Sequence, residues 1–76
     1  PNKPPITFFV NGEPETTDQS ELTVTAILQL AGFTPATDYV LASENPPRTY
    51  ADYGETVKLH QHQRFTAQFN GQTPVS

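Results

Sequence analysis

The sequence contains no cysteine, no methionine and no tryptophan, and only four of its 76 residues are lysine or arginine. Without cysteine, neither a disulfide nor a thiolate zinc site can add to the stability of the fold. The four cations (Lys3, Arg48, Lys58 and Arg64) are spread along a chain of net charge −4. Phosphate backbones and anionic membrane surfaces attract clustered cations, so the sequence disfavours nucleic acid and membranes as partners.

Long apolar runs are missing as well. No stretch approaches the roughly 20 apolar residues of a membrane-spanning helix, and no signal-peptide pattern opens the chain. These absences predict a cytoplasmic protein.

Catalytic patterns are also missing. The chain has no cysteine nucleophile, no plausible Ser-His-Asp order and no phosphate-cradling glycine loop. A domain this small leaves no room for a substrate pocket of about 300 Å³ or more. We therefore expect neither an enzyme nor a bound cofactor.

The first predicted element is a β-hairpin. Residues 6–10 alternate apolar side chains and end at Asn11-Gly12, and this pair favours a type I′ turn because both positions need φ > 0. The return strand is expected within residues 15–22, whose threonines suit a half-exposed edge.

A short amphipathic helix follows. Its apolar residues are spaced at i, i+3, i+4 and i+7, namely Val24, Ile27, Leu28 and Ala31. Thr23 is the predicted N-cap, because its hydroxyl can accept from an unpaired backbone N–H. Gly32 suits the left-handed position after the helix, with Phe33 folding back, and Pro35 prevents continuation.

The second half of the chain predicts three more strands. These are residues 38–43, 56–59 and 64–69, with a long connection over residues 44–55 and a turn over residues 60–63. The order is therefore strand, strand, helix, strand, strand, strand.

One helix in this order can bury its stripe only against one sheet face, which predicts a two-layer α+β domain. The first and last strands are the most apolar, so we expect them side by side in the centre of a mixed sheet, the β-grasp arrangement. The expected core comprises Ile6, Phe8, Val10, Val24, Ile27, Leu28, Ala31, Leu41, Val57, Leu59, Phe65 and Phe69.

Four segments carry a resemblance to a known family: the "NG" hairpin, the helix exit "ILQLAGFTP", the strand "DYVL" and the segment "ETVKLHQHQRF". Over about residues 6–71 the chain resembles the bacterial multiubiquitin family of ubiquitin-like domains. The resemblance covers the ubiquitin-like domain over residues 6–71. The prolines of residues 1–5 predict an extended leader, and the polar residues and Pro74 predict that residues 72–76 form a flexible tail.

The resemblance also implies a function. Such a domain is a protein modifier, or one unit of a tandem precursor, and its expected partners are a ubiquitin-activating-like enzyme, a conjugating enzyme and a deconjugating peptidase. Many ubiquitin-like modifiers end in Gly-Gly, whereas this chain offers Asn70-Gly71. Gly71 is the candidate processing and conjugation residue, because a residue without Cβ allows close backbone approach. An ordinary strand exit at Asn70-Gly71 is the alternative.

Two other functions stay open. A non-conjugated ubiquitin-like adaptor would bind partners through the sheet face that the helix leaves open. A sulfur carrier shares the fold but needs a Gly-Gly end, which this chain lacks.

Candidate partner-binding residues lie on that open face. Phe9 points away from the helix if its neighbours in the strand point toward it, and Lys58, Thr66 and Gln68 are expected near it. Clustered exposed apolar groups mark interaction surfaces, although a single exposed aromatic residue is common.

The remaining polar and aromatic residues favour structural roles. His60 and His62 are two possible ligands, too few for a closed zinc site, and are expected in a solvated turn. Tyr50 and Tyr53 are expected to pack their rings against the long connection with their hydroxyls in water. Acidic residues gather around the second strand and are expected to protect an edge from pairing; they are Glu13, Glu15, Asp18 and Glu21.

Overall fold

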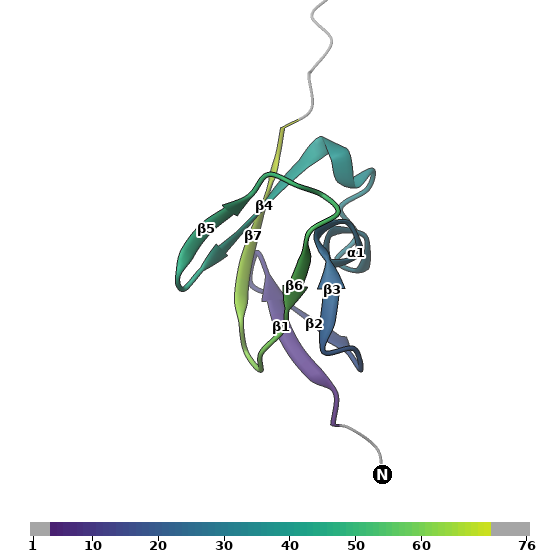
Figure 1. Cartoon of the computed structure of the whole chain (residues 1–76), viewed down its shortest axis with the longest axis vertical. Coiled ribbons are helices and arrows are strands. Elements are labelled where there is room, and N and C mark those ends of the chain that lie inside the picture. The colour runs from purple at the N-terminus through teal and green to yellow at the C-terminus, as the bar shows by residue number, and fades with distance from the viewer. Residues whose placement is uncertain (1–3, 71–76) are drawn as a thin grey trace, which may run out of the picture.

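The chain folds into short strands that precede and follow a single α-helix (Figure 1). The computed structural model describes residues 4–70, so Gly71 and the predicted tail 72–76 lie outside the described residues. Within them the strands are β1 (Ile6–Val10), β2 (Glu13–Thr17), β3 (Glu21–Thr23), β4 (Tyr39–Glu44), β5 (Pro47–Tyr50), β6 (Thr56–Lys58) and β7 (Arg64–Phe69). The helices are α1 (Val24–Leu30) and the 3₁₀ helix η1 (Ala36–Asp38). Neither of these helices is long enough to cross a membrane.

The strands form a mixed five-stranded sheet and a separate two-stranded sheet. The larger sheet has the order β2-β1-β7-β4-β5, and the smaller one pairs β3 with β6. β1 and β7 are parallel, whereas the other pairs are antiparallel. The prediction that the first and last strands are neighbours in the centre of a mixed sheet is therefore confirmed. The fold is a small α+β arrangement.

The hairpin between β1 and β2 turns where the sequence predicts. Asn11 and Gly12 have φ values of 54° and 81°, the left-handed pair that a type I′ turn requires. Val10 pairs directly with Glu13, so the return strand begins at Glu13 and ends at Thr17. The prediction of one return strand within residues 15–22 was wrong, because this segment contributes to two strands, β2 and β3, in different sheets.

Helix α1 begins and ends as predicted. The Oγ1 atom of Thr23 accepts from the backbone N–H of Ala26 at 3.1 Å. At the other end, Gly32 has φ 90°, its N–H donates to the Gln29 carbonyl at 3.0 Å, and the Phe33 N–H donates to the Leu28 carbonyl at 2.8 Å. This pair of bonds is the Schellman motif, which needs a left-handed residue and so favours glycine.

The long connection predicted over residues 44–55 contains a strand, β5, that the sequence did not indicate. β5 pairs antiparallel with β4 at the edge of the sheet, and Tyr50 lies opposite Leu41 and is buried. Pro47 is compatible with it because proline is tolerated at the first position of an edge strand. The hydroxyl of Tyr53, expected in water, instead donates to the Tyr39 carbonyl at 2.5 Å.

The core lies between α1 and one face of the five-stranded sheet. Nine of the predicted core residues are buried, and Ile6 and Ala31 pack half-buried against them. Phe69 contradicts the prediction, since it is 58% exposed. It lies at the end of β7 opposite Tyr39 and packs its ring edge-on against Tyr39, with the centroids 5.6 Å apart. Ala36, Tyr50 and Ala67 are buried without having been predicted.

Leu28 and Leu30 provide a matched test of this core. Leu28 is fully buried and Leu30 is 45% exposed on the same helix. Leu28→Ala is expected to lower the free energy of unfolding by about 2–5 kcal/mol, because it removes buried methyl groups and leaves a cavity. Leu30→Ala is expected to change it by less than about 1 kcal/mol. Urea denaturation measures both, and equal losses in the two variants would contradict this placement of the helix.

Candidate open-face binding site

The face of the large sheet opposite α1 carries alternate side chains of β1 and β7. Phe8 and Val10 are buried on the core face, so Phe9 points to the open face and is half-buried there. In β7, Phe65 and Ala67 face the core, which leaves Thr66 and Gln68 on the open face. Three of the four predicted partner-binding residues, namely Phe9, Thr66 and Gln68, therefore share this face.

Lys58 does not share this face. It lies in β6, opposite Glu21 of β3, in the two-stranded sheet. The expectation that Lys58 lies near Phe9 on the open face of the large sheet was wrong. Alternation along a strand indicates which residues share a face, but it does not indicate the sheet to which the strand belongs.

Arg64 and His62 surround Phe9 in place of Lys58. The parallel register puts Arg64 opposite Phe9, with its guanidinium carbon 5.2 Å from the centre of the Phe9 ring. The imidazole of His62 is stacked on the same ring at an interplanar angle of 26° and a centroid distance of 6.4 Å. We call Phe9, His62 and Arg64 the open-face cluster. Cation–π contact of this kind is favourable and holds the guanidinium over the ring.

The turn before β7 is fastened to β1 by its glutamines and its backbone. The side-chain amide of Gln61 donates to the Pro5 carbonyl at 2.7 Å and accepts from the Thr7 N–H at 3.0 Å. The His62 N–H donates to the Thr7 carbonyl at 2.6 Å, and the Phe9 N–H donates to the Gln63 carbonyl at 2.8 Å. These bonds fix the turn relative to Phe9, so the cluster has a defined geometry.

The backbone of His62 adopts a left-handed conformation with φ 64°. This region is unfavourable for a residue with a Cβ, although histidine enters it more often than most. The turn is also closed internally, because the Gln63 side chain accepts from the His60 N–H at 3.1 Å.

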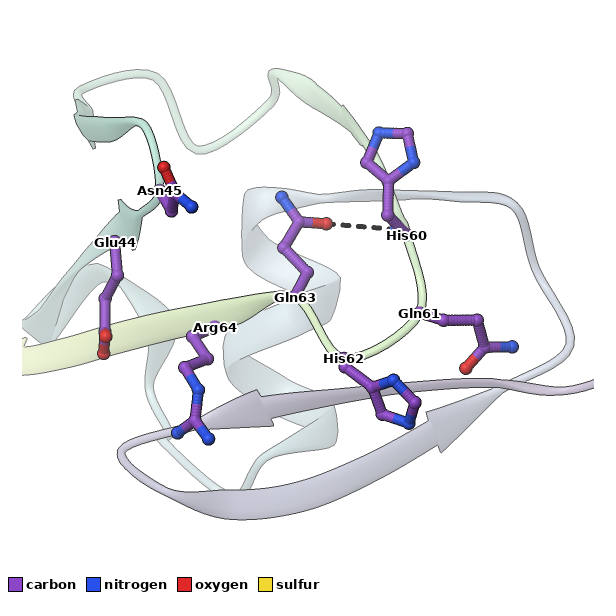
Figure 2. Close-up of a pocket in the computed structure, with 7 residues that line it drawn as sticks. All are labelled: Glu44, Asn45, His60, Gln61, His62, Gln63 and Arg64. Atoms are coloured by element: carbon purple, nitrogen blue, oxygen red, sulfur yellow. Dashed lines mark hydrogen bonds between the residues drawn. The ribbon is translucent and has the colours of Figure 1, made fainter.

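An open pocket of about 450 Å³ lies beside the cluster, between the turn at Glu44 and Asn45 and the turn over residues 60–63. The expectation that a domain this small leaves no room for a pocket of this size was therefore wrong. Figure 2 shows His62 and Arg64 pointing to the same side of the chain as Glu44, whereas His60 points the other way. The lining is polar, with imidazole, amide, guanidinium and carboxylate groups. Groups of this kind can form hydrogen bonds and ion pairs with a polypeptide ligand.

The imidazoles of His60 and His62 were candidates for metal ligands in the sequence. Within residues 4–70, no three His, Asp or Glu side chains lie close enough together to hold a metal ion. The contact that His62 does make is the stack on Phe9.

A second aromatic group lies at the far end of β7. Phe33, Tyr39 and Phe69 form a row of edge-on rings, with Phe33 and Tyr39 at 5.1 Å between centroids. The Asn70 N–H donates to the Asp38 carbonyl at 2.6 Å. The aromatic row therefore ends next to Asn70, the last described residue, which is still hydrogen-bonded to the body of the domain.

Two of the four acidic residues predicted at an edge lie there, whereas Glu21 belongs to β3 of the smaller sheet and Asp18 follows β2. Glu13 and Glu15 belong to β2, which is the outer strand of the large sheet. Burial, together with the charge of Glu13, raises the pKa of the Glu15 carboxyl from its ordinary value of 4.5.

No family model, curated protein or solved structure matches the chain. The functional interpretation of the open-face cluster therefore depends on its own geometry.

Sequence reasoning missed two of the three residues of the open-face cluster. His62 and Arg64 were not placed near Phe9, because their position depends on the parallel register of two strands that are far apart in the sequence. The signal that could have indicated Arg64 is its place on the same face of the last strand as Thr66 and Gln68.

Phe8 and Phe9 provide a matched pair for the surface. Phe8→Ala is expected to lower the free energy of unfolding by about 3–5 kcal/mol, because Phe8 is fully buried. Phe9→Ala is expected to change it far less, since its ring lies on the open face between exposed side chains. Thermal unfolding of both variants measures the difference. A loss with Phe9→Ala as large as with Phe8→Ala would place Phe9 in the core.

Glu15 predicts a pH dependence of stability. A carboxyl whose pKa is raised by folding favours the folded state at low pH and loses this contribution as the pH rises through the folded pKa. Glu15→Gln is therefore expected to be slightly more stable than wild type at pH 7, and the difference should vanish below the ordinary value of 4.5. Glu13→Gln, which removes only the neighbouring charge, should give a smaller gain. Urea denaturation at several pH values measures this, and a gain that grows toward low pH would contradict it.

Proposed function

We propose that this chain is a ubiquitin-like protein modifier of the β-grasp type, conjugated to targets through Gly71 by partner enzymes. The observation that supports the proposal is the position of β7. It is a central strand parallel to β1, and the N–H of the residue that follows it, Asn70, donates to the Asp38 carbonyl at 2.6 Å. Gly71 is the next residue in the sequence.

A glycine at this point suits the chemistry of a modifier. Adenylation requires a C-terminal carboxylate to enter a narrow channel and reach a nucleotide phosphate, and a residue without Cβ allows that approach. Because β7 ends in a hydrogen bond to the body of the domain, residues before Gly71 are held by the fold. Trimming after Gly71 would then produce a carboxylate next to a rigid domain.

The partners that this function requires are a peptidase, an activating enzyme and a conjugating enzyme. The chain itself would supply the carboxylate and a surface by which these enzymes bind it. The open-face cluster is the proposed surface, because the Phe9 ring lies there against both the His62 imidazole and the Arg64 guanidinium.

The alternative function is a ubiquitin-like adaptor that is not conjugated. The observation that favours it is the same cluster, since an open face can bind partners whether or not Gly71 is processed. The two functions differ in what happens to the end of the chain, which makes them experimentally distinguishable.

Trimming and activation test the modifier function. The full chain is incubated with a ubiquitin-activating-like enzyme and a peptidase from the same cell, and the products are weighed by mass spectrometry. The expected product ends at Gly71. Gly71→Ala is expected to slow trimming or adenylation by roughly tenfold or more, equivalent to about 1.4 kcal/mol in the transition state.

Gln72→Ala is the control and should change the rates little, because residue 72 would leave with the released segment. Conjugation of an untrimmed chain through Ser76 would contradict processing at Gly71. A chain that is neither trimmed nor conjugated, but that binds a partner through Phe9, would establish the adaptor instead.

A further inference from the structure

His62 occupies a backbone position that glycine would fill with less strain. Its φ of 64° places a Cβ in the left-handed region, at a cost of about 1 kcal/mol or more relative to a relaxed conformation. The side chain that this position carries is exposed and stacks on Phe9. A role of the imidazole in ligand contact would explain why histidine, and not glycine, occupies this strained position.

Arg64 presents a cation beside that ring. The ion pair formed within residues 4–70 joins Arg48 to Glu55, and Arg64 forms none there. Its guanidinium is exposed and lies over the Phe9 ring. The fork of N–H donors that guanidinium carries matches the two oxygens of a carboxylate.

The pocket beside the cluster adds further polar groups. Its lining includes His62 and Arg64, and also Asn45 and Gln63, of which Gln63 points with His60 to the other side of the chain (Figure 2). A single acidic side chain, that of Glu44, belongs to the same lining. The pocket is therefore rich in hydrogen-bond donors, and its one carboxylate opposes the binding of another.

We propose that the open-face cluster and this pocket bind an acidic peptide segment of a partner protein. A carboxylate of the segment pairs with Arg64 beside His62, and an adjacent apolar side chain covers the exposed part of the Phe9 ring. This inference rests on the proposed function and specifies which kind of partner the open-face cluster binds. It applies equally to a modifier and to an adaptor, because it does not involve Gly71.

Charge favours an acidic segment over other occupants. Arg64 on the central strand β7 forms no ion pair within residues 4–70, Glu13 and Glu15 lie two strands away on β2, and Glu44 is the one carboxylate in the pocket lining. A basic segment would meet Arg64 directly and be repelled. A second copy of this chain could offer its β2 edge to the cluster, and this occupant is tested separately.

The binding test uses nuclear magnetic resonance of the full ¹⁵N-labelled chain at pH 7. The probe is the capped hexapeptide Glu-Leu-Asp-Glu-Leu-Asp, and its matched control is Gln-Leu-Asn-Gln-Leu-Asn, which has the same shape without charge. The acidic peptide is expected to shift the amide signals of Phe9, His62 and Arg64, and the amide peptide is not. Raising the salt from about 0.05 M to about 0.5 M should weaken the binding, because exposed charges are screened.

Three variants separate recognition from stability. His62→Gly should keep the thermal midpoint close to that of wild type, because glycine tolerates the backbone conformation, and yet weaken peptide binding. Arg64→Gln should weaken binding by roughly twofold to fivefold, the range expected for one exposed ion pair. Glu44→Gln should strengthen binding by a similar factor of roughly two to five, because it removes the opposing charge.

Several results would overturn the proposal. Equal shifts with both peptides would show that charge is not recognised, and shifts confined to other residues would place the site elsewhere. Unchanged binding in both His62→Gly and Arg64→Gln would exclude the cluster. Sedimentation of the protein alone, if it showed a dimer that Glu13→Gln and Arg64→Gln both dissolve, would identify a second copy as the occupant. None of these results affects trimming at Gly71, so failure here and failure of the modifier function are distinguishable.

Discussion

The structure depends on the parallel pairing of β1 with β7, and the side chain of Asn11 completes this pairing. β1 ends at the hairpin while β7 continues, so the N–H and carbonyl of Ala67 face a position that β1 no longer occupies. The Asn11 amide fills it, accepting from the Ala67 N–H and donating to the Ala67 carbonyl, both at 3.0 Å. A single asparagine thus supplies the left-handed turn residue and two further bonds of the parallel ladder.

The same pairing organises both ends of β7. At its start, Gln61 and the Phe9 N–H bind the turn to β1, which brings His62 and Arg64 to the Phe9 ring. On its other side, β7 pairs with β4 from Phe65 to Phe69, so its end is held after the pairing with β1 has stopped. The open-face cluster therefore lies at the start of β7, and the chain leads to Gly71 from its end. The proposed binding and processing functions both depend on the position of this one strand.

The sequence predicted the features that depend on local chemistry. The Asn11-Gly12 turn, the Thr23 cap and the Gly32 exit each follow from the conformation that those residues allow. Strand β5 was missed, because proline in a short segment indicates a loop unless an edge partner is known. Exposure of Phe69 and the position of Lys58 depend on which strands become neighbours, and alternation alone does not determine this. The contacts of Asn11 and Gln61 cross more than fifty residues of chain, beyond the range of any local pattern.

The most direct test of this account is amide hydrogen exchange in Asn11→Gly. Glycine adopts the turn conformation without strain, so the variant removes the two ladder bonds and keeps the hairpin. The account predicts faster exchange of the Ala67 N–H, little change at Thr66 and Gln68, whose amides face β4, and a loss of about 1 kcal/mol in stability per bond removed. Unchanged protection of Ala67, with full stability retained, would contradict the claim that Asn11 completes the central pair.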